Sequence, residues 1–138
     1  MSEQLTLNYI NLTPYLISLV LGLIAGSLLE FAYKSNEQKR LVPPKFINIQ
    51  MYGLVAVFLF MLSQLNWPWP VEVLAIVAIT TGLELITGLM NLKINQARAW
   101  DYSGEVWNYR GLICLKFSVY WLLLGAVYYY LILPRIFN

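Results

Sequence analysis

The sequence predicts an all-α, polytopic membrane protein: a four-transmembrane-helix bundle that forms a single integral membrane domain over residues 1–138. Of the 138 residues, 59% are hydrophobic and only 12% are charged, and the mean hydropathy is +0.62. A soluble domain of this size cannot hide so much apolar surface, because it buries only about two-thirds of what its unfolded chain exposes. Four stretches also approach the roughly 20 apolar residues that a spanning helix needs. We therefore expect a multi-pass protein of the cell membrane, with the lipid bilayer as its solvent.

The first two helices are expected at about residues 14–33 and 47–65. Thr13 can cap the first helix, and Pro14 suits the first helical position, where its missing N–H costs nothing. The amino terminus lacks the basic segment that opens a signal peptide, so we expect the first helix to be retained. The core of the second helix carries no charge.

The last two helices are expected at about residues 71–92 and 111–133. Pro68 and Pro70 separate the second helix from the third, because proline stops a helix, and the Trp residues beside them suit the lipid–water interface. Pro134 is expected to end the fourth helix.

The two halves share a pattern that favours two repeated helical hairpins. In each half a helix with one carboxylate is followed by a basic loop, and an Asn then precedes a Gly at the start of the returning helix. These residues are Glu30, Asn48 and Gly53 in the first half, and Glu84, Asn108 and Gly111 in the second. Unrelated hairpins would alternate in the same way, so duplication and coincidence both stay open.

The basic residues predict the orientation of the chain. Seven of them lie in the two long loops, and Arg135 alone lies on the opposite side. The positive-inside rule therefore places both long loops in the cytoplasm and both termini outside. The formal net charge of +2 gives no reason to expect a nucleic-acid partner. The seven loop residues are Lys34, Lys39, Arg40, Lys45, Lys93, Arg98 and Arg110.

The composition excludes several kinds of chemistry. The chain has no His, and Cys114 is its single Cys. Disulfides within the chain, zinc fingers and mechanisms that need an imidazole are therefore excluded. The chain also lacks the G-x-x-x-x-G-K-[ST] phosphate loop, so it cannot hydrolyse ATP by that mechanism. We expect no metal site and no cofactor.

Two carboxylates lie within predicted spans and are the main functional candidates. A charged group inside hydrocarbon costs at least about 2.5 to 3.5 kcal/mol, so Glu30 and Glu84 need partners or a proton. Both lie in the cytoplasmic half of their helices, which predicts a polar pocket open to the cytoplasm. The residues expected to form this substrate or ion pocket are Glu30, Glu84, Asp101, Asn108 and Arg110.

Small residues at helical spacing predict faces where helices pack closely. The expected packing residues are Gly22, Gly26, Gly88, Gly111, Ser118 and Gly125. Lys116 points about 140° away from the small-residue face of its helix, at 100° per residue. We therefore expect Lys116 to reach toward lipid phosphates.

The second long loop interleaves aromatic, acidic and basic residues, a pattern typical of a segment anchored at the lipid headgroups. An ordinary interfacial loop that holds the third and fourth helices in register accounts for the pattern equally well. The residues expected in this interfacial loop are Trp100, Tyr102, Ser103 and Trp107.

A family resemblance is closest between residues 82 and 125. It is carried by ELITG at 84–88, WDYS at 100–103 and the pair Asn108 and Gly111, which ICLKFSVYWLLLG follows at 113–125. In this segment the chain resembles the small four-helix membrane proteins catalogued as putative ABC-transporter type IV, whose vertebrate relatives are called transmembrane protein 229. In the first half, Glu30 and the Tyr52-Gly53 pair fit more loosely, since the loop between them is basic and lacks the family's usual Gly before Pro. The resemblance implies a four-helix topology and a transport permease.

Transport is the function that these observations favour: a permease, channel or secondary transporter subunit that uses the intramembrane carboxylates. Such a small chain is expected to act as a homo-oligomer or with a membrane protein partner, and an ABC role requires a separate ATPase. The alternative is a membrane-embedded enzyme that modifies a lipid or phosphate ester, with Glu84 and Asp101 holding Mg²⁺ or acting as acid and base, and Arg98 and Arg110 binding phosphate. The missing His and the lack of an activated nucleophile count against that enzyme. A non-catalytic subunit that packs against a larger partner through its glycine faces is the third hypothesis.

Overall fold

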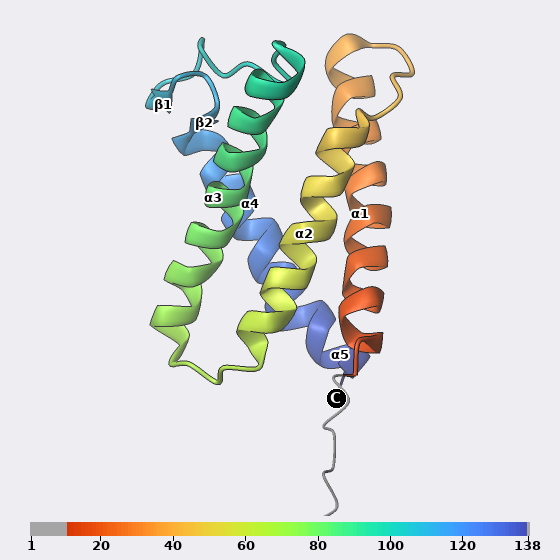
Figure 1. Ribbon diagram of the computed structural model, residues 1–138, viewed down its shortest axis with the longest axis vertical. Helices are drawn as coiled ribbons and strands as arrows, with labels where there is room; N and C mark the ends of the chain where they lie inside the picture. The colour runs from red at the N-terminus through yellow and green to blue at the C-terminus, as the bar shows by residue number, and fades with distance from the viewer. Residues whose placement is uncertain (1–10, 138) are drawn as a thin grey trace, which may run out of the picture.

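Four long helical segments run side by side in the computed structural model, which describes residues 11–137 (Figure 1). The fourth segment is continuous but contains one π-helical turn between two α-helical parts. The helices are α1 (Thr13–Gln38), α2 (Phe46–Ser63), α3 (Trp69–Asn95), α4 (Leu115–Val127), η1 (Tyr128–Ile132) and α5 (Leu133–Phe137), and the strands are β1 (Asn108–Tyr109) and β2 (Ile113–Cys114). The all-α class with four helices is thus confirmed.

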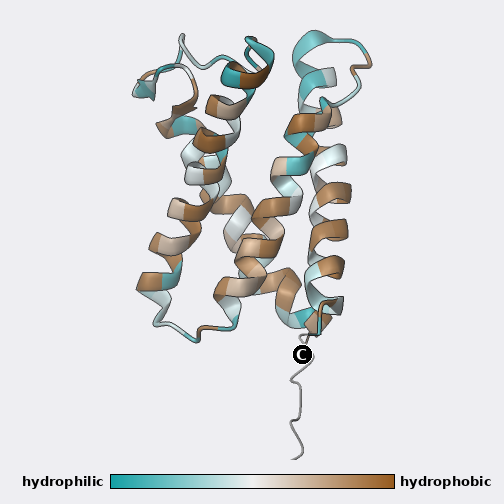
Figure 2. Ribbon diagram, in the orientation of Figure 1, coloured by the Kyte–Doolittle hydropathy of each residue, from teal (hydrophilic) through white to brown (hydrophobic). Residues whose placement is uncertain are grey.

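All four segments are long and apolar enough to cross a membrane. Hydrophobic residues cover the helices along most of their length, and hydrophilic residues gather at the end that holds the two long loops (Figure 2). Large apolar side chains such as Leu28 and Leu74 are exposed on the outer surface, as they are when lipid rather than water surrounds the helices. The chain is a multi-pass membrane protein.

The helices α1 and α2 pack closely against each other through glycine. A Cβ atom added at Gly22 would lie 2.5 Å from the backbone oxygen of Tyr52, and one added at Gly26 would lie 2.5 Å from the Tyr52 Cβ. From the other side, Gly53 accepts the side chains of Leu19 and Leu23. The packing glycines of the first half therefore face the chain's own second helix.

The helices α3 and α4 meet through small and hydroxyl-bearing residues. A Cβ atom at Gly125 would lie 2.7 Å from Ile76, and the hydroxyl of Thr81 donates a 3.1 Å hydrogen bond to Ser118. Nearer the loops, Gly88 lies against Leu112. Ser118, Gly125 and Gly88 thus lie at contacts within the bundle.

The fourth helix begins later than the sequence predicts, at Leu115 instead of near Gly111. The intervening residues form a hairpin in which Asn108 pairs with Cys114 and Tyr109 with Ile113. Gly111 has a φ of +68° in the turn of this hairpin, where an L side chain would be strained. Gly111 is therefore a turn residue and does not lie at a helix contact.

The fourth helix also ends later than predicted, because it continues through Pro134 to Phe137. The π-helical turn η1 ends at Ile132, two residues before this proline. In a regular α-helix the proline ring would clash with the carbonyl four residues earlier, and the wider π-turn gives it room.

The second long loop folds back onto the end of the bundle and is tied to the hairpin. The indole of Trp100 donates to the Leu112 carbonyl at 2.8 Å, and the amide of Tyr102 donates to the Gly111 carbonyl at 2.8 Å. Trp107, by contrast, is 80% exposed. Of the four predicted loop residues, Trp100 and Tyr102 are therefore turned inward, whereas Ser103 and Trp107 are exposed.

Candidate functional site

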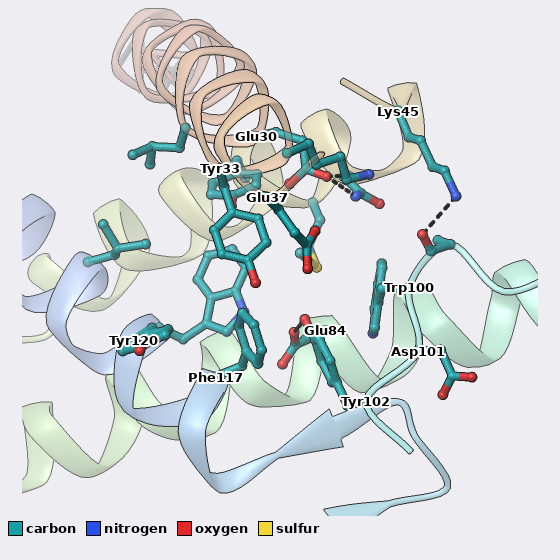
Figure 3. Close-up of a pocket in the computed structure, with 18 of the residues that line it drawn as sticks. Glu30, Tyr33, Glu37, Lys45, Glu84, Trp100, Asp101, Tyr102, Phe117 and Tyr120 are labelled. Atoms are coloured by element: carbon teal, nitrogen blue, oxygen red, sulfur yellow. Dashed lines mark hydrogen bonds and ion pairs between the residues drawn. The ribbon is translucent and has the colours of Figure 1, made fainter. Parts of the chain in front are cut away.

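A cavity of about 660 Å³ lies at the loop end of the bundle, bounded by all four helices and by the second loop (Figure 3). Its volume falls within the range of roughly 300 to 1,000 Å³ that is usual for small-molecule sites. Five of the seven acidic residues of the chain line it, against two lysines. The acidic residues are Glu30, Glu37, Glu84, Asp101 and Glu105, and the lysines are Lys34 and Lys45.

Glu84, on α3, is the most deeply buried of these acids, with 1% of its surface exposed. Its Oε1 accepts a 2.8 Å hydrogen bond from the hydroxyl of Tyr102. Its Oε2 is buried and has no hydrogen-bond partner among the described residues. Trp121 also lines the cavity close to this carboxylate, but its indole N–H does not meet hydrogen-bond geometry. No Lys or Arg in residues 11–137 forms an ion pair with Glu84.

Glu30, on α1, has partners where Glu84 has none. Its Oε1 lies 2.8 Å from the Lys34 ammonium, one turn further along the helix, and accepts a 2.5 Å hydrogen bond from the amide of Asn48 on α2. Glu30 is 8% exposed and Asn48 is 4% exposed. The side-chain oxygen Oδ1 of Asn48 receives no hydrogen bond from the described residues. The charge of Glu30 is thus balanced within the chain.

The two buried acids face one shared cavity. Figure 3 shows Glu30 and Glu84 on different walls of the cavity. Glu30 is on α1, in the first half of the chain, and Glu84 is on α3, in the second half. Tyr52 of α2 also lines this cavity. The cavity therefore joins the candidate residues of both predicted hairpins in one site.

Tyr102, in the second long loop, lines the cavity and contacts Glu84. Burial, followed by the negative charge of Glu84, raises the pKa of the Tyr102 hydroxyl. The hydroxyl therefore keeps its proton and serves as a hydrogen-bond donor to the carboxylate. Its ring stacks on Phe117 of α4, with 4.4 Å between centroids and 11° between planes.

Ion pairs and hydrogen bonds order the rim of the cavity. Glu105 lies 2.9 Å from the ammonium of Lys116, so that Lys116 pairs with a loop acid where the sequence predicted a reach toward lipid phosphates. Lys45 donates a 2.9 Å hydrogen bond to the Ala99 carbonyl and ties the two long loops together (Figure 3).

Asp101 occupies an exposed position on this rim. The Ser103 hydroxyl and amide donate to its Oδ1, and Arg98 lies 3.8 Å away. The hydroxyl of Ser103, then its amide, and then the charge of Arg98 hold the pKa of Asp101 below its usual value.

Two residues of the predicted pocket lie outside the cavity. Asn108 is in β1, where its amide donates 2.9 Å to the Glu105 carbonyl and its oxygen accepts 2.9 Å from the Gly111 amide. Arg110 is exposed at the hairpin turn, where its carbonyl accepts a 2.8 Å hydrogen bond from Arg98. Asn48 and Asn108, at matching places in the two sequence halves, therefore have different surroundings.

The sequence did not identify Tyr102 as the partner of Glu84, nor the aromatic residues of α4 as walls of the site. The repeat pattern includes Asn48 but gives no sign that Asn48 pairs with Glu30. A usable signal was the spacing of Phe117, Tyr120 and Trp121, which puts three rings on adjacent faces of one helix.

The donor set of the cavity limits what it can hold. No group of three or more His, Cys, Asp or Glu residues able to bind a metal occurs in the described part of the chain. Two buried acceptors of the cavity-lining residues have no partner, Glu84 Oε2 on α3 and Asn48 Oδ1 on α2. The cavity can therefore receive one cationic or hydrogen-bond-donating group at Glu84.

Comparison with known proteins gives one family. The model of the family described as "Putative ABC-transporter type IV" matches residues 17–138. Neither the curated proteins nor the solved structures contain a match to the chain. With the family model covering nearly the whole sequence and four segments able to span a membrane, the chain belongs to the Putative ABC-transporter type IV family.

Proposed function

We propose that the protein is a transport component that binds a cation at Glu84 and exchanges it through the cavity at the loop end. The observation that carries this proposal is a carboxylate inside a membrane span, 1% exposed, with one oxygen unpartnered and no basic residue of the described chain beside it. A buried carboxylate in this state must hold a proton or attract a cation.

Comparison with Glu30 sharpens the assignment. Glu30 is neutralised by Lys34 and bonded to Asn48, as expected of a buried charge with a structural role. Close helix packing does not require Glu84, since the neighbouring contacts of α3 are made by Gly88 and Thr81. We therefore assign cation binding to Glu84 and a structural role to Glu30, on the other wall of the cavity.

The cavity is proposed to open to the cytoplasm. Lys34, Lys45 and Arg98 lie at the same end of the bundle as the cavity, and basic loops stay on the cytoplasmic side. In this orientation both termini lie outside. The amino-terminal ten residues and Asn138 are outside the described residues.

An ABC role would need further chains. The sequence contains no Walker-type phosphate loop, so a separate ATPase would have to supply the hydrolysis of ATP. Four spans are few for a complete pathway, and we propose that the protein works as a homo-oligomer or with a membrane protein partner. Gly22 and Gly26 are occupied within the chain, so such a contact would use other surfaces.

The test is cation flux in proteoliposomes that carry a gradient of protons, Na⁺ or K⁺, followed in each case with a dye selective for that cation. We expect flux with the unaltered protein and its loss in Glu84→Gln, which keeps the shape of the side chain and removes its charge. Glu72→Gln is the matched control, because Glu72 is on the same helix but at the far end, where it accepts hydrogen bonds from Tyr129 and Tyr130. Equal flux in the Glu84→Gln and unaltered proteins would overturn the proposal.

A further inference from the structure

We infer that the ligand of the cavity is an organic ammonium ion whose body is apolar or aromatic. The inference rests on the proposed function, since it assigns a chemical class to the cation held at Glu84. It is carried by two further features, the aromatic lining of the cavity and the apolar side through which the cavity reaches the lipid-facing surface.

Seven of the 21 residues that line the cavity, or one third, are aromatic, whereas aromatic residues make up 15% of the whole chain. The rings touch one another: Phe117 stacks on Tyr102 and meets Tyr33 edge to face at 6.1 Å between centroids. Tyr52 and Trp121 form a second pair at 4.8 Å. The seven are Tyr33, Tyr52, Trp100, Tyr102, Phe117, Tyr120 and Trp121.

A carboxylate among aromatic rings favours an organic cation over a metal ion. Ring faces attract cations through their quadrupole, and this attraction gains when the cation is large and easily desolvated. A metal ion such as Ca²⁺ instead takes six to eight oxygen ligands. The cavity-lining residues offer two buried acceptors without a partner, Glu84 Oε2 on α3 and Asn48 Oδ1 on α2. Two acceptors fall short of the ligands of such a metal ion, whereas Glu84 Oε2 alone can accept an N–H group of an ammonium.

The cavity has a polar end and an apolar side. At the loop end it is lined by polar residues such as Glu37 and Gln38. Leu29 of α1 and Leu123 and Leu124 of α4 also line it, and all three are exposed. Because these leucines belong to membrane-spanning helices, we take this side of the cavity to open toward lipid. The cavity therefore offers water to the charged head of a ligand and lipid to its apolar body, which matches an amphiphilic ammonium ion.

Binding of benzylammonium to the purified full-length protein in detergent, measured by isothermal titration calorimetry, tests the inference. Benzyl alcohol is the matched neutral ligand, with the same ring and no charge, and NaCl is the inorganic control. We expect the unaltered protein to bind benzylammonium at least about tenfold more tightly than benzyl alcohol, since a hydrogen bond to a charged group is worth that factor or more. Equal affinity for the two ligands would overturn the inference without the use of any variant.

Two pairs of variants locate the site. Glu84→Gln should weaken benzylammonium binding by about tenfold or more and leave benzyl alcohol unchanged, whereas Glu72→Gln should change neither. Phe117→Leu should weaken benzylammonium binding by about 2- to 30-fold, the range of a cation–aromatic contact, whereas Phe58→Leu, on an exposed face of α2 outside the cavity, should not. Unchanged benzylammonium binding in both cavity variants would overturn the inference.

The flux assay separates this inference from the proposed function. Glu84-dependent flux of protons or Na⁺ without benzylammonium binding would reject the organic ligand and retain cation transport. Glu84-dependent benzylammonium binding without flux of any cation, including benzylammonium itself, would support the ligand class and reject transport.

Discussion

The hydroxyl of Tyr102 donates a 2.8 Å hydrogen bond to Oε1 of Glu84 and so connects the second loop to a carboxylate buried within α3. The second loop therefore does more than connect α3 to α4. It supplies the one hydrogen bond that this carboxylate receives among the described residues. We therefore expect the folding of the loop and the protonation or ligand binding of Glu84 to depend on each other.

Removal of this hydrogen bond should destabilise the protein. Tyr102→Phe leaves both oxygens of Glu84 without a partner, and a buried acceptor left unsatisfied costs about 1–3 kcal/mol. We expect a lower midpoint of thermal unfolding in detergent. The midpoint should fall much less in the Glu84→Leu background, where the acceptor is absent; equal effects of Tyr102→Phe in the two backgrounds would show that the hydrogen bond contributes nothing.

Glycine substitutions in two helices should have opposite effects on stability. Gly22→Ala places a Cβ 2.5 Å from the Tyr52 carbonyl, and the backbone shift this forces costs about 1–3 kcal/mol. Gly82→Ala meets nothing within 4 Å and should stabilise α3 by about 0.5–1 kcal/mol, because alanine favours a helix. Thermal unfolding of the two variants side by side checks this, and a stable Gly22→Ala would contradict the packing of α1 on α2.

The hairpin turn should tolerate no side chain at Gly111. Its φ of +68° strains any L residue, and a Cβ there would lie 2.6 Å from Asp101 Oδ1. We expect Gly111→Ala to loosen the loop and increase its cleavage by protease. Gly104→Ala is the control in the same loop, since its Cβ would meet nothing within 4 Å. Equal cleavage of the two variants would count against the observed turn.

The Asp101 turn should respond to acid in one direction. Because the pKa of Asp101 is lowered by Ser103, the carboxylate stabilises the folded loop at pH values above its usual pKa of 3.8. That contribution is lost as the pH falls through the lower folded value. NMR titration of ¹³C-labelled aspartate should show the pKa of Asp101 rising toward 3.8 in Ser103→Ala, and an unchanged pKa would refute the role of the hydroxyl.

Much of this arrangement was predictable from the sequence, since hydropathy and proline positions locate helices in a membrane protein. Glu30 and Glu84 were recognisable because a carboxylate within a span needs an explanation whatever surrounds it. Gly111 was misplaced in a helix, because the apolar pattern of the fourth helix extends back through the hairpin and hides the turn. The partners Tyr102 and Asn48 could not be predicted, since each lies 18 residues from its carboxylate and reaches it through tertiary packing.

Orientation in the membrane can be measured by labelling single cysteines. In a Cys114→Ser background, Asn36→Cys lies near the cavity end and Asn66→Cys between α2 and α3 at the opposite end, and both positions are exposed. In intact cells a membrane-impermeant maleimide should label position 66 and not position 36. Position 36 should be labelled only after the cells are permeabilised. The reverse pattern would place the cavity on the outer face.

The reactivity of Glu84 toward dicyclohexylcarbodiimide tests the central claim most directly, because this apolar reagent modifies protonated carboxyl groups within membranes. Peptide mass spectrometry of the treated protein should find the label on Glu84 and not on Glu30, which is held by Lys34. Labelling of Glu84 should fall as benzylammonium is added and stay constant with benzyl alcohol. Labelling that no cation reduces would contradict a cation site at Glu84.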